Sequence, residues 1–254
     1  MAAKVKFKHI LNELKEHAPF TFFGAVLGIV FMLLFKNIGQ AGSKVLFVTF
    51  HPAHVVLSAM VTTAMFKIHS VRKNLLVMIL VGYFGSIGVA TLSDVIMPHF
   101  GAQLFGLDIP TEAKLHHHIA TTDNGSTTVT EEHKRHKIHF GFIEEWYLVN
   151  PAAVLGIVIA YFFPRTKFPH AAHILISTWA SAAYLLMDME HQMSLASSAN
   201  VFLTLFLSVW LPCCTSDIIF PLLFIKPDVT LTGSCPICGR GGHIHTEGEK
   251  ESSH

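Results

Sequence analysis

The sequence is poor in charged residues, in cysteine and in the short motifs of common enzyme classes. Only 14% of its 254 residues are charged, whereas a soluble domain carries about 25%. A net charge of +1 gives no basic surface of the kind that binds nucleic acid, so no nucleic-acid partner is expected. Four cysteines, two of them adjacent and two in a Cys-x-x-Cys pair, exclude a disulfide framework.

Three common nucleotide-binding and catalytic motifs are also missing. The sequence has no phosphate-binding glycine loop, no His-Glu-x-x-His motif and no Gly-x-Ser-x-Gly motif. The chain therefore carries no ATPase of its own. No small-residue cleavage site follows the basic N-terminus, so we expect no cleaved signal peptide.

What the sequence does have is long apolar stretches, and 51% of its residues are hydrophobic. Stretches of about 17 apolar residues or more can span a bilayer as helices. This pattern predicts an all-α integral membrane protein that crosses the lipid bilayer six times. The predicted spans are 18–36, 45–66, 75–97, 147–163, 169–188 and 199–225.

Three short motifs occur twice, in the same order. They are Ala-Val-Leu-Gly-Ile-Val, His-x-Ala-His, and a Ser-Asp pair with a proline four residues after the aspartate. Ordered repetition of this kind indicates a duplicated unit. The copies lie at 25–30 and 153–158, at 51–54 and 170–173, and at 93–98 and 216–221.

The distribution of Lys and Arg predicts the orientation. With six spans, twelve of the 18 basic residues fall on the side that holds both termini, so both termini are predicted to be cytoplasmic. Each unit has three spans, so the second unit enters the membrane from the opposite side, as in the inverted repeats of many transporters. We expect a multi-pass protein of the bacterial inner (cell) membrane.

This topology divides the chain into five parts. Two of them are the three-helix repeats, and the other three are polar. The polar parts are a basic cytoplasmic segment able to lie on the membrane surface, an external histidine-rich loop, and a cytoplasmic tail with cysteine and histidine. In chain order the parts are 1–17, the repeats 18–97 and 147–225 with the loop 98–146 between them, and the tail 226–254.

The repeated polar residues predict a metal site. His51 and His54 are three residues apart, so they share one helical face. With Asp94 they offer two nitrogens and one oxygen, a set that suits Zn²⁺, Fe²⁺, Mn²⁺ or Co²⁺. Buried carboxylates are costly in a membrane and mark functional sites. The second copy supplies the matching residues His170, His173 and Asp217.

The sequence leaves open whether these residues form one site or two. Their positions along the spans place the first set toward the outside and the second toward the cytoplasm, which favours two related sites. The alternative is one merged site at the repeat interface that holds two metal ions.

The tail carries a second candidate metal site. Cys235 and Cys238 form a Cys-x-x-Cys followed by glycine, and His243 and His245 follow. Two thiolates at this spacing can bind one Zn²⁺, as in half of a zinc ribbon. The cysteine pair Cys213-Cys214 precedes the second Ser-Asp motif. We expect it to pack as small apolar residues, and the alternative is a soft metal ligand near the inner site.

These features favour a transporter for a divalent transition-metal cation rather than an enzyme. One alternative is an integral-membrane metalloenzyme with a buried dinuclear site. A single cluster with metals about 3.5–4 Å apart favours that enzyme, and two clusters separated along the membrane normal favour transport. A proton-conducting membrane protein that uses histidine is the other alternative. The sequence predicts neither the oligomeric state nor accessory subunits.

Overall fold

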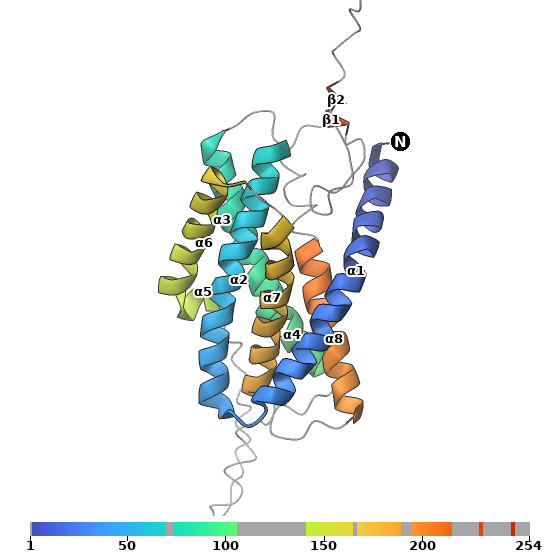
Figure 1. Ribbon diagram of the computed structural model, residues 1–254, viewed down its shortest axis with the longest axis vertical. Coiled ribbons are helices and arrows are strands. Elements are labelled where there is room, and N and C mark those ends of the chain that lie inside the picture. The colour runs from blue at the N-terminus through green and yellow to red at the C-terminus, as the bar shows by residue number, and fades with distance from the viewer. Residues whose placement is uncertain are drawn as a thin grey trace, which may run out of the picture.

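The protein is a bundle of helices (Figure 1). A computed structural model describes residues 2–69, 74–105, 141–164, 167–188 and 195–214, with 229–230 and 245–246. The helices are α1 (Ala2–Phe35), α2 (Gly39–His69), α3 (Leu75–Thr91), the π-helix η1 (Leu92–Ile96), α4 (Met97–Leu104), α5 (Gly141–Glu144), α6 (Trp146–Phe162), α7 (Lys167–Asp188) and α8 (Leu195–Cys214). The strands β1 (Val229–Thr230) and β2 (His245–Thr246) pair in antiparallel fashion.

Three helical stretches are long and apolar enough to cross a membrane: His17–Phe35, Gly39–Lys67 and Leu75–Leu104. Three shorter apolar helical stretches accompany them in the described part of the chain: Trp146–Phe162, Ala171–Met187 and Ser198–Cys213. A 17-residue helix is roughly 26 Å long, slightly less than the hydrocarbon core of about 30 Å. These helices indicate a membrane protein.

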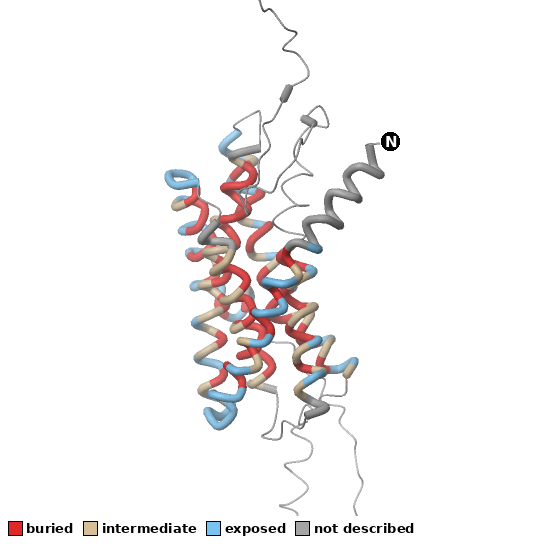
Figure 2. The backbone as a smooth tube through the Cα atoms, turned by 45° about the vertical axis from the view of Figure 1, so that its right-hand side comes forward, coloured by how far each residue is buried: buried red, intermediate tan, exposed pale blue. Residues whose placement is uncertain are grey.

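The outer surface of the bundle is apolar as well. Buried residues lie inside the bundle, and exposed residues occupy its outer faces and ends (Figure 2). Large apolar side chains such as Phe23, Leu34, Leu76 and Phe84 are more than half exposed. A patch of this kind is unusual on a soluble monomer, and it suits contact with lipid tails.

Helices occupy the described part of each predicted stretch, and the sixth stretch, 199–225, is described only to Cys214. Two differences stand out. The segment 1–17 was expected as a basic part able to lie on the membrane surface, and in the structure Ala2–Phe35 is one continuous helix that passes through Pro19. The third stretch was expected to end at residue 97, just before Pro98. Instead the chain makes one π-helical turn and continues as α4 to Leu104.

The helices alternate in direction along the chain, so α1 and α6 run opposite ways (Figure 1). The most extensive pair is α2 with α7. Helix α1 packs on α7 and α8, and α6 packs on α2 and α3. Each half of the chain therefore packs its first helix against helices of the other half.

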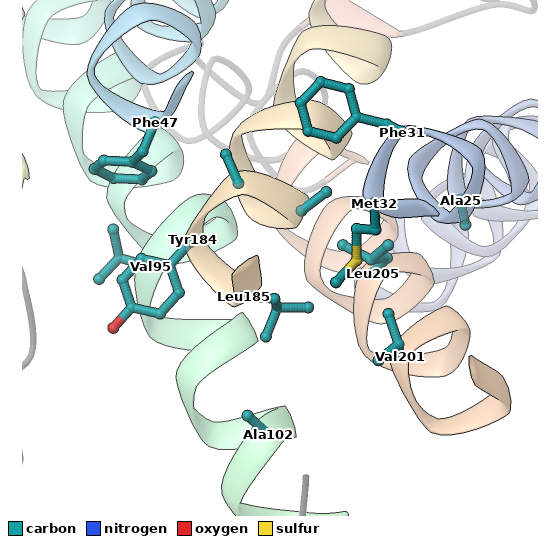
Figure 3. Close-up of a cluster of buried hydrophobic side chains, with 12 residues drawn as sticks. Ala25, Phe31, Met32, Phe47, Val95, Ala102, Tyr184, Leu185, Val201 and Leu205 are labelled. Atoms are coloured by element: carbon teal, nitrogen blue, oxygen red, sulfur yellow. The ribbon is translucent and has the colours of Figure 1, made fainter. Parts of the chain in front are cut away.

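One large apolar cluster joins the first half to α7 and α8. Figure 3 shows Met32 of α1 beside Leu205 of α8, and Val95 of η1 beside Tyr184 of α7. Phe47 of α2 completes this side of the cluster, and its ring lies 5.8 Å from that of Tyr184. Burying large apolar side chains against several helices fixes their relative positions, and here it holds η1 against α7.

Two glycines mark close contacts between the two halves of the chain. A Cβ on Gly28 of α1 would lie 2.7 Å from Thr178 Cγ2 of α7. A Cβ on Gly156 of α6 would lie 2.3 Å from the Val56 carbonyl oxygen and 2.7 Å from the Ala59 Cβ, both on α2. Both helix pairs therefore need glycine, as is common where membrane helices pack closely.

Candidate metal centre

Two buried histidines of α2 share one carboxylate. His51 and His54 lie near the middle of the apolar stretch Gly39–Lys67 and are at most 1% exposed. Their Nδ1 atoms lie 2.9 and 2.7 Å from the same oxygen, Oδ2 of Asp94. The spacing of three residues puts both rings on one face of α2, as the sequence predicted.

The π-helical turn positions Asp94. The Met97 N–H donates to the Leu92 carbonyl, five residues back, instead of to Ser93. The residue five positions after Ser93 is Pro98, which has no N–H to donate. The Ser93 carbonyl accepts instead from Ser181 Oγ of α7, at 3.0 Å. The π-helical turn therefore leaves the Ser93 carbonyl free to form a hydrogen bond that joins η1 to α7. Turns of this kind are frequent at functional sites.

The other carboxylate oxygen of Asp94 takes two hydroxyl donors. Ser93 Oγ lies 2.7 Å and Ser177 Oγ 3.1 Å from Oδ1. Asp94 is fully buried, and the two hydroxyls and two imidazoles supply four hydrogen bonds, about as many as an ionised carboxylate accepts. With Asp94 ionised, each histidine donates from Nδ1 and keeps the lone pair of Nε2.

This arrangement is common around protein metal ions. Metal-ligating histidines usually donate their second N–H to a carboxylate, which fixes the tautomer and the ring orientation. Asp94 lies on the Nδ1 side of both rings, so it is placed to orient the histidines rather than to ligate the same ion through Oδ2. The Nε2 atoms of His51 and His54 are buried and have no hydrogen-bond partner among the described residues.

The second half of the chain brings His173 to the same place. The rings of His54 and His173 lie 4.6 Å apart between centroids, although the two residues belong to different copies of the repeated motif. The sequence favoured separate outer and inner sites. The structure brings one histidine of each set, His54 and His173, into contact in the interior of the bundle.

Cys213 of α8 completes a group able to bind a metal ion. One ligand atom each from His54, His173 and Cys213 all lie within 4.8 Å of one another, and all three residues are buried. The Cys213 Sγ lies 3.8 Å from His173 Nε2. Tetrahedral Zn²⁺ places such N and S ligands about 3.6 Å apart. These three residues are called the central site below.

The remaining predicted ligands are described only in part or not at all. The backbones of His170 and His245 are described, within α7 and β2, but their side chains are not. Asp217, Cys235, Cys238 and His243 lie outside the described residues, as does most of the histidine-rich loop.

Sequence reasoning missed two kinds of residue at this site. For Cys213 the sequence favoured packing over a role as a soft metal ligand, although it lies beside His173. Ser177 and Ser181 were not considered, although both copies carry a serine four residues after the second histidine, at Ser58 and Ser177. The motif is therefore longer than His-x-Ala-His, and extending the comparison by four residues finds this serine.

Asn150 of α6 lies in the fourth predicted span. Its Oδ1 accepts a hydrogen bond from the Tyr83 hydroxyl of α3, at 2.9 Å. Asn150 therefore joins two helices in the structure.

Comparisons with known proteins add no assignment: no protein-family model, curated protein or solved structure matches the chain.

Proposed function

We propose that the protein is a multi-pass membrane transporter of a divalent transition-metal cation. The contact between His54 and His173 carries this proposal. These residues occupy equivalent positions in the two copies of the repeated motif, and Cys213 adds a third ligand atom beside them. Transporters with inverted repeats bind substrate near the membrane midplane, at the interface between the repeats.

Inverted three-helix repeats are part of the proposal. In support, α1 and α6 carry the same six-residue motif and run in opposite directions (Figure 1). The contacts of their glycines correspond as well. Gly28 meets Thr178, five residues after His173, and Gly156 meets Ala59, five residues after His54. A pseudo-twofold axis between the halves accounts for both contacts.

The ligand types of the central site favour Zn²⁺ over the other predicted ions. Imidazole and thiolate suit Zn²⁺, whereas Mn²⁺ prefers oxygen ligands. Fe²⁺ and Co²⁺ remain candidate substrates. The Cys213 thiol must lose its proton before it binds a metal, so binding releases a proton into the site. Exchange of protons for the cation is the coupling that this chemistry favours.

We propose that the second repeat contributes His170 and Asp217 to metal binding, as the counterparts of His51 and Asp94. Ser58 supports this assignment because it is the counterpart of Ser177, which donates to Asp94. The Ser58 hydroxyl is buried and has no hydrogen-bond partner among the described residues. We also propose cytoplasmic termini in a bacterial inner membrane, with Cys235, Cys238, His243 and His245 as a metal-binding tail.

Zinc flux into proteoliposomes tests the proposal directly. The purified chain is reconstituted with a Zn²⁺-sensitive dye inside the vesicles. We expect His54→Ala and His173→Ala each to abolish protein-dependent flux, because each removes one ligand of the central site. His9→Ala, a histidine change before the first apolar stretch, is the matched control and should transport normally. Normal flux in both central-site variants would refute the proposal.

The meeting of the two histidine sets also favours a second candidate function. A single buried metal cluster is the arrangement expected of a membrane metalloenzyme. The two functions differ in metal exchange. An enzyme retains its metal while sealed vesicles show no flux, whereas a transporter exchanges bound ⁶⁵Zn²⁺ with the medium on both sides. Tight, unexchanged metal without flux would therefore favour the enzyme.

A further inference from the structure

The Nε2 atom of His51 is not among the ligand atoms grouped at the central site, and it lies beside a separate turn of the chain. Its Nδ1 is taken by Asp94, and the ring of Phe47 stacks on it at 5.1 Å with an interplanar angle of 9°. These two contacts fix the orientation of the imidazole. The buried Nε2 has no hydrogen-bond partner among the described residues, and leaving such an atom unpaired lowers stability. A bound ligand would remove this cost.

The segment that covers this nitrogen brings a carboxylate with it. Helix α5 is a single turn, and the Glu145 N–H donates to the Gly141 carbonyl at 2.8 Å. Residues four apart lie on one face of such a turn. A Cβ on Gly141 would lie 2.9 Å from His51 Nε2 and 3.5 Å from Glu145 Oε2. Both polar atoms therefore lie beside the same point of the backbone, and glycine at 141 leaves them room.

Burial argues that Glu145 has a specific role here. Glu145 is 5% exposed, whereas the adjacent Glu144 is exposed. Its burial keeps the Glu145 carboxylate inside the bundle, beside the same point of the backbone as His51 Nε2. His51 Nε2 and the Glu145 carboxylate together offer one nitrogen and oxygen ligands, a combination that divalent transition metals accept.

We propose that His51 and Glu145 form a second cation site, distinct from the central site. This second site binds the same divalent cation through His51 Nε2 and the Glu145 carboxylate, directly or through water. Asp94 orients both sites at once, because it accepts from His51 on one side and from His54 on the other. The inference rests on the proposed metal-transport function, and it adds a position that the cation occupies before or after the central site.

Cobalt binding to the full-length protein in lipid nanodiscs tests this inference. Every protein compared carries alanine at the four proposed tail ligands, Cys235, Cys238, His243 and His245, so that the tail adds neither an ion nor a thiolate band, and "wild-type" below refers to the two sites within the bundle. Co²⁺ bound by a thiolate gives a near-ultraviolet charge-transfer band, so the central site reports through Cys213, whereas the second site has no sulfur. We expect the wild-type protein to bind two Co²⁺ ions by calorimetry. Glu145→Gln should bind one and keep the full charge-transfer band. Cys213→Ser should lose the band and keep the ion held by Glu145.

Two further variants make the result specific to the buried carboxylate. Glu144→Gln changes the adjacent exposed residue and should bind both ions. Glu145→Asp retains the carboxylate and should restore the second ion, which a purely structural role of Glu145 in α5 does not predict. Thermal unfolding of each variant checks that it is folded.

The outcomes separate this inference from the function on which it rests. A wild-type protein that binds one Co²⁺ with the charge-transfer band, unchanged by Glu145→Gln, overturns the second site alone. Two ions in both wild type and Glu145→Gln also overturn it. No binding of Co²⁺ or Zn²⁺ by the wild-type protein overturns the metal-transport proposal together with this inference.

Discussion

Gly156 is the position where the packing of the two halves can be tested most directly. Replacing it with alanine puts a methyl group 2.3 Å from the Val56 carbonyl oxygen and 2.7 Å from the Ala59 Cβ. Ordinary contact begins near 3.4 Å, so α6 must move about 1 Å away from α2. The obstacle is backbone and Cβ rather than the flexible end of a side chain, and rotamer changes cannot relieve it.

The expected size follows from two opposing terms. Overpacking of this kind costs about 1–3 kcal/mol. Alanine is favoured over glycine inside a helix by roughly 0.5–1 kcal/mol. We therefore expect Gly156→Ala to lower the free energy of unfolding by about 1–2 kcal/mol. Reversible unfolding in mixed micelles, followed by circular dichroism, measures this difference.

Two other glycines serve as matched controls. A Cβ on Gly88 of α3 meets nothing within 4 Å, so Gly88→Ala should raise the free energy of unfolding by about 0.5–1 kcal/mol. Gly28→Ala should fall between the two, because its nearest obstacles are the side-chain ends of Thr178 and Leu205. Equal stability of Gly156→Ala and Gly88→Ala would contradict the close packing of α6 on α2.

Two more predictions concern the groups around the carboxylate. Asp94→Asn keeps the size of the side chain but removes an acceptor from the histidines, so we expect Zn²⁺ affinity to fall about 10–100-fold. Competition with a chelating dye measures the affinity, and an unchanged value contradicts the orienting role. Ser181→Ala leaves the Ser93 carbonyl without its donor, and should lower the free energy of unfolding by about 1–3 kcal/mol. Unfolding as for Gly156→Ala measures it, and no loss contradicts the proposed π-turn contact.

Much of the helical structure could be predicted from hydropathy. Apolar stretches of membrane-spanning length form helices because the backbone must satisfy its own hydrogen bonds in lipid. The behaviour of residues around Pro98 could not be predicted in this way. Proline can end a helix, or the helix can continue through a π-helical turn. Which of these occurs depends on whether another segment supplies a hydrogen-bond donor to the carbonyl that proline leaves without one. Here Ser181 of α7 supplies that donor.

The candidate site shows the same division. The histidine pair on α2 and the buried Asp94 follow from spacing and from the cost of burying a carboxylate. The meeting of His54 with His173 does not follow, since distance along each span gives depth only coarsely and says nothing about where helices cross. Small buried residues such as Ser58, Ala59 and Ser177 let membrane helices approach closely. The close approach of α2 and α7 brings His54 and His173 together.

Sharing one carboxylate oxygen couples the two histidines. A cation on Nε2 of His54 makes its Nδ1–H a stronger donor, so Oδ2 of Asp94 gives up more of its electron density to His54. The same oxygen then holds His51 less firmly, and His51 becomes a weaker ligand at the second site. Two cations near one carboxylate also repel each other. In the proposed transport, occupation of one site would therefore favour release of the cation from the other, and passage through a membrane requires binding weak enough for the ion to leave.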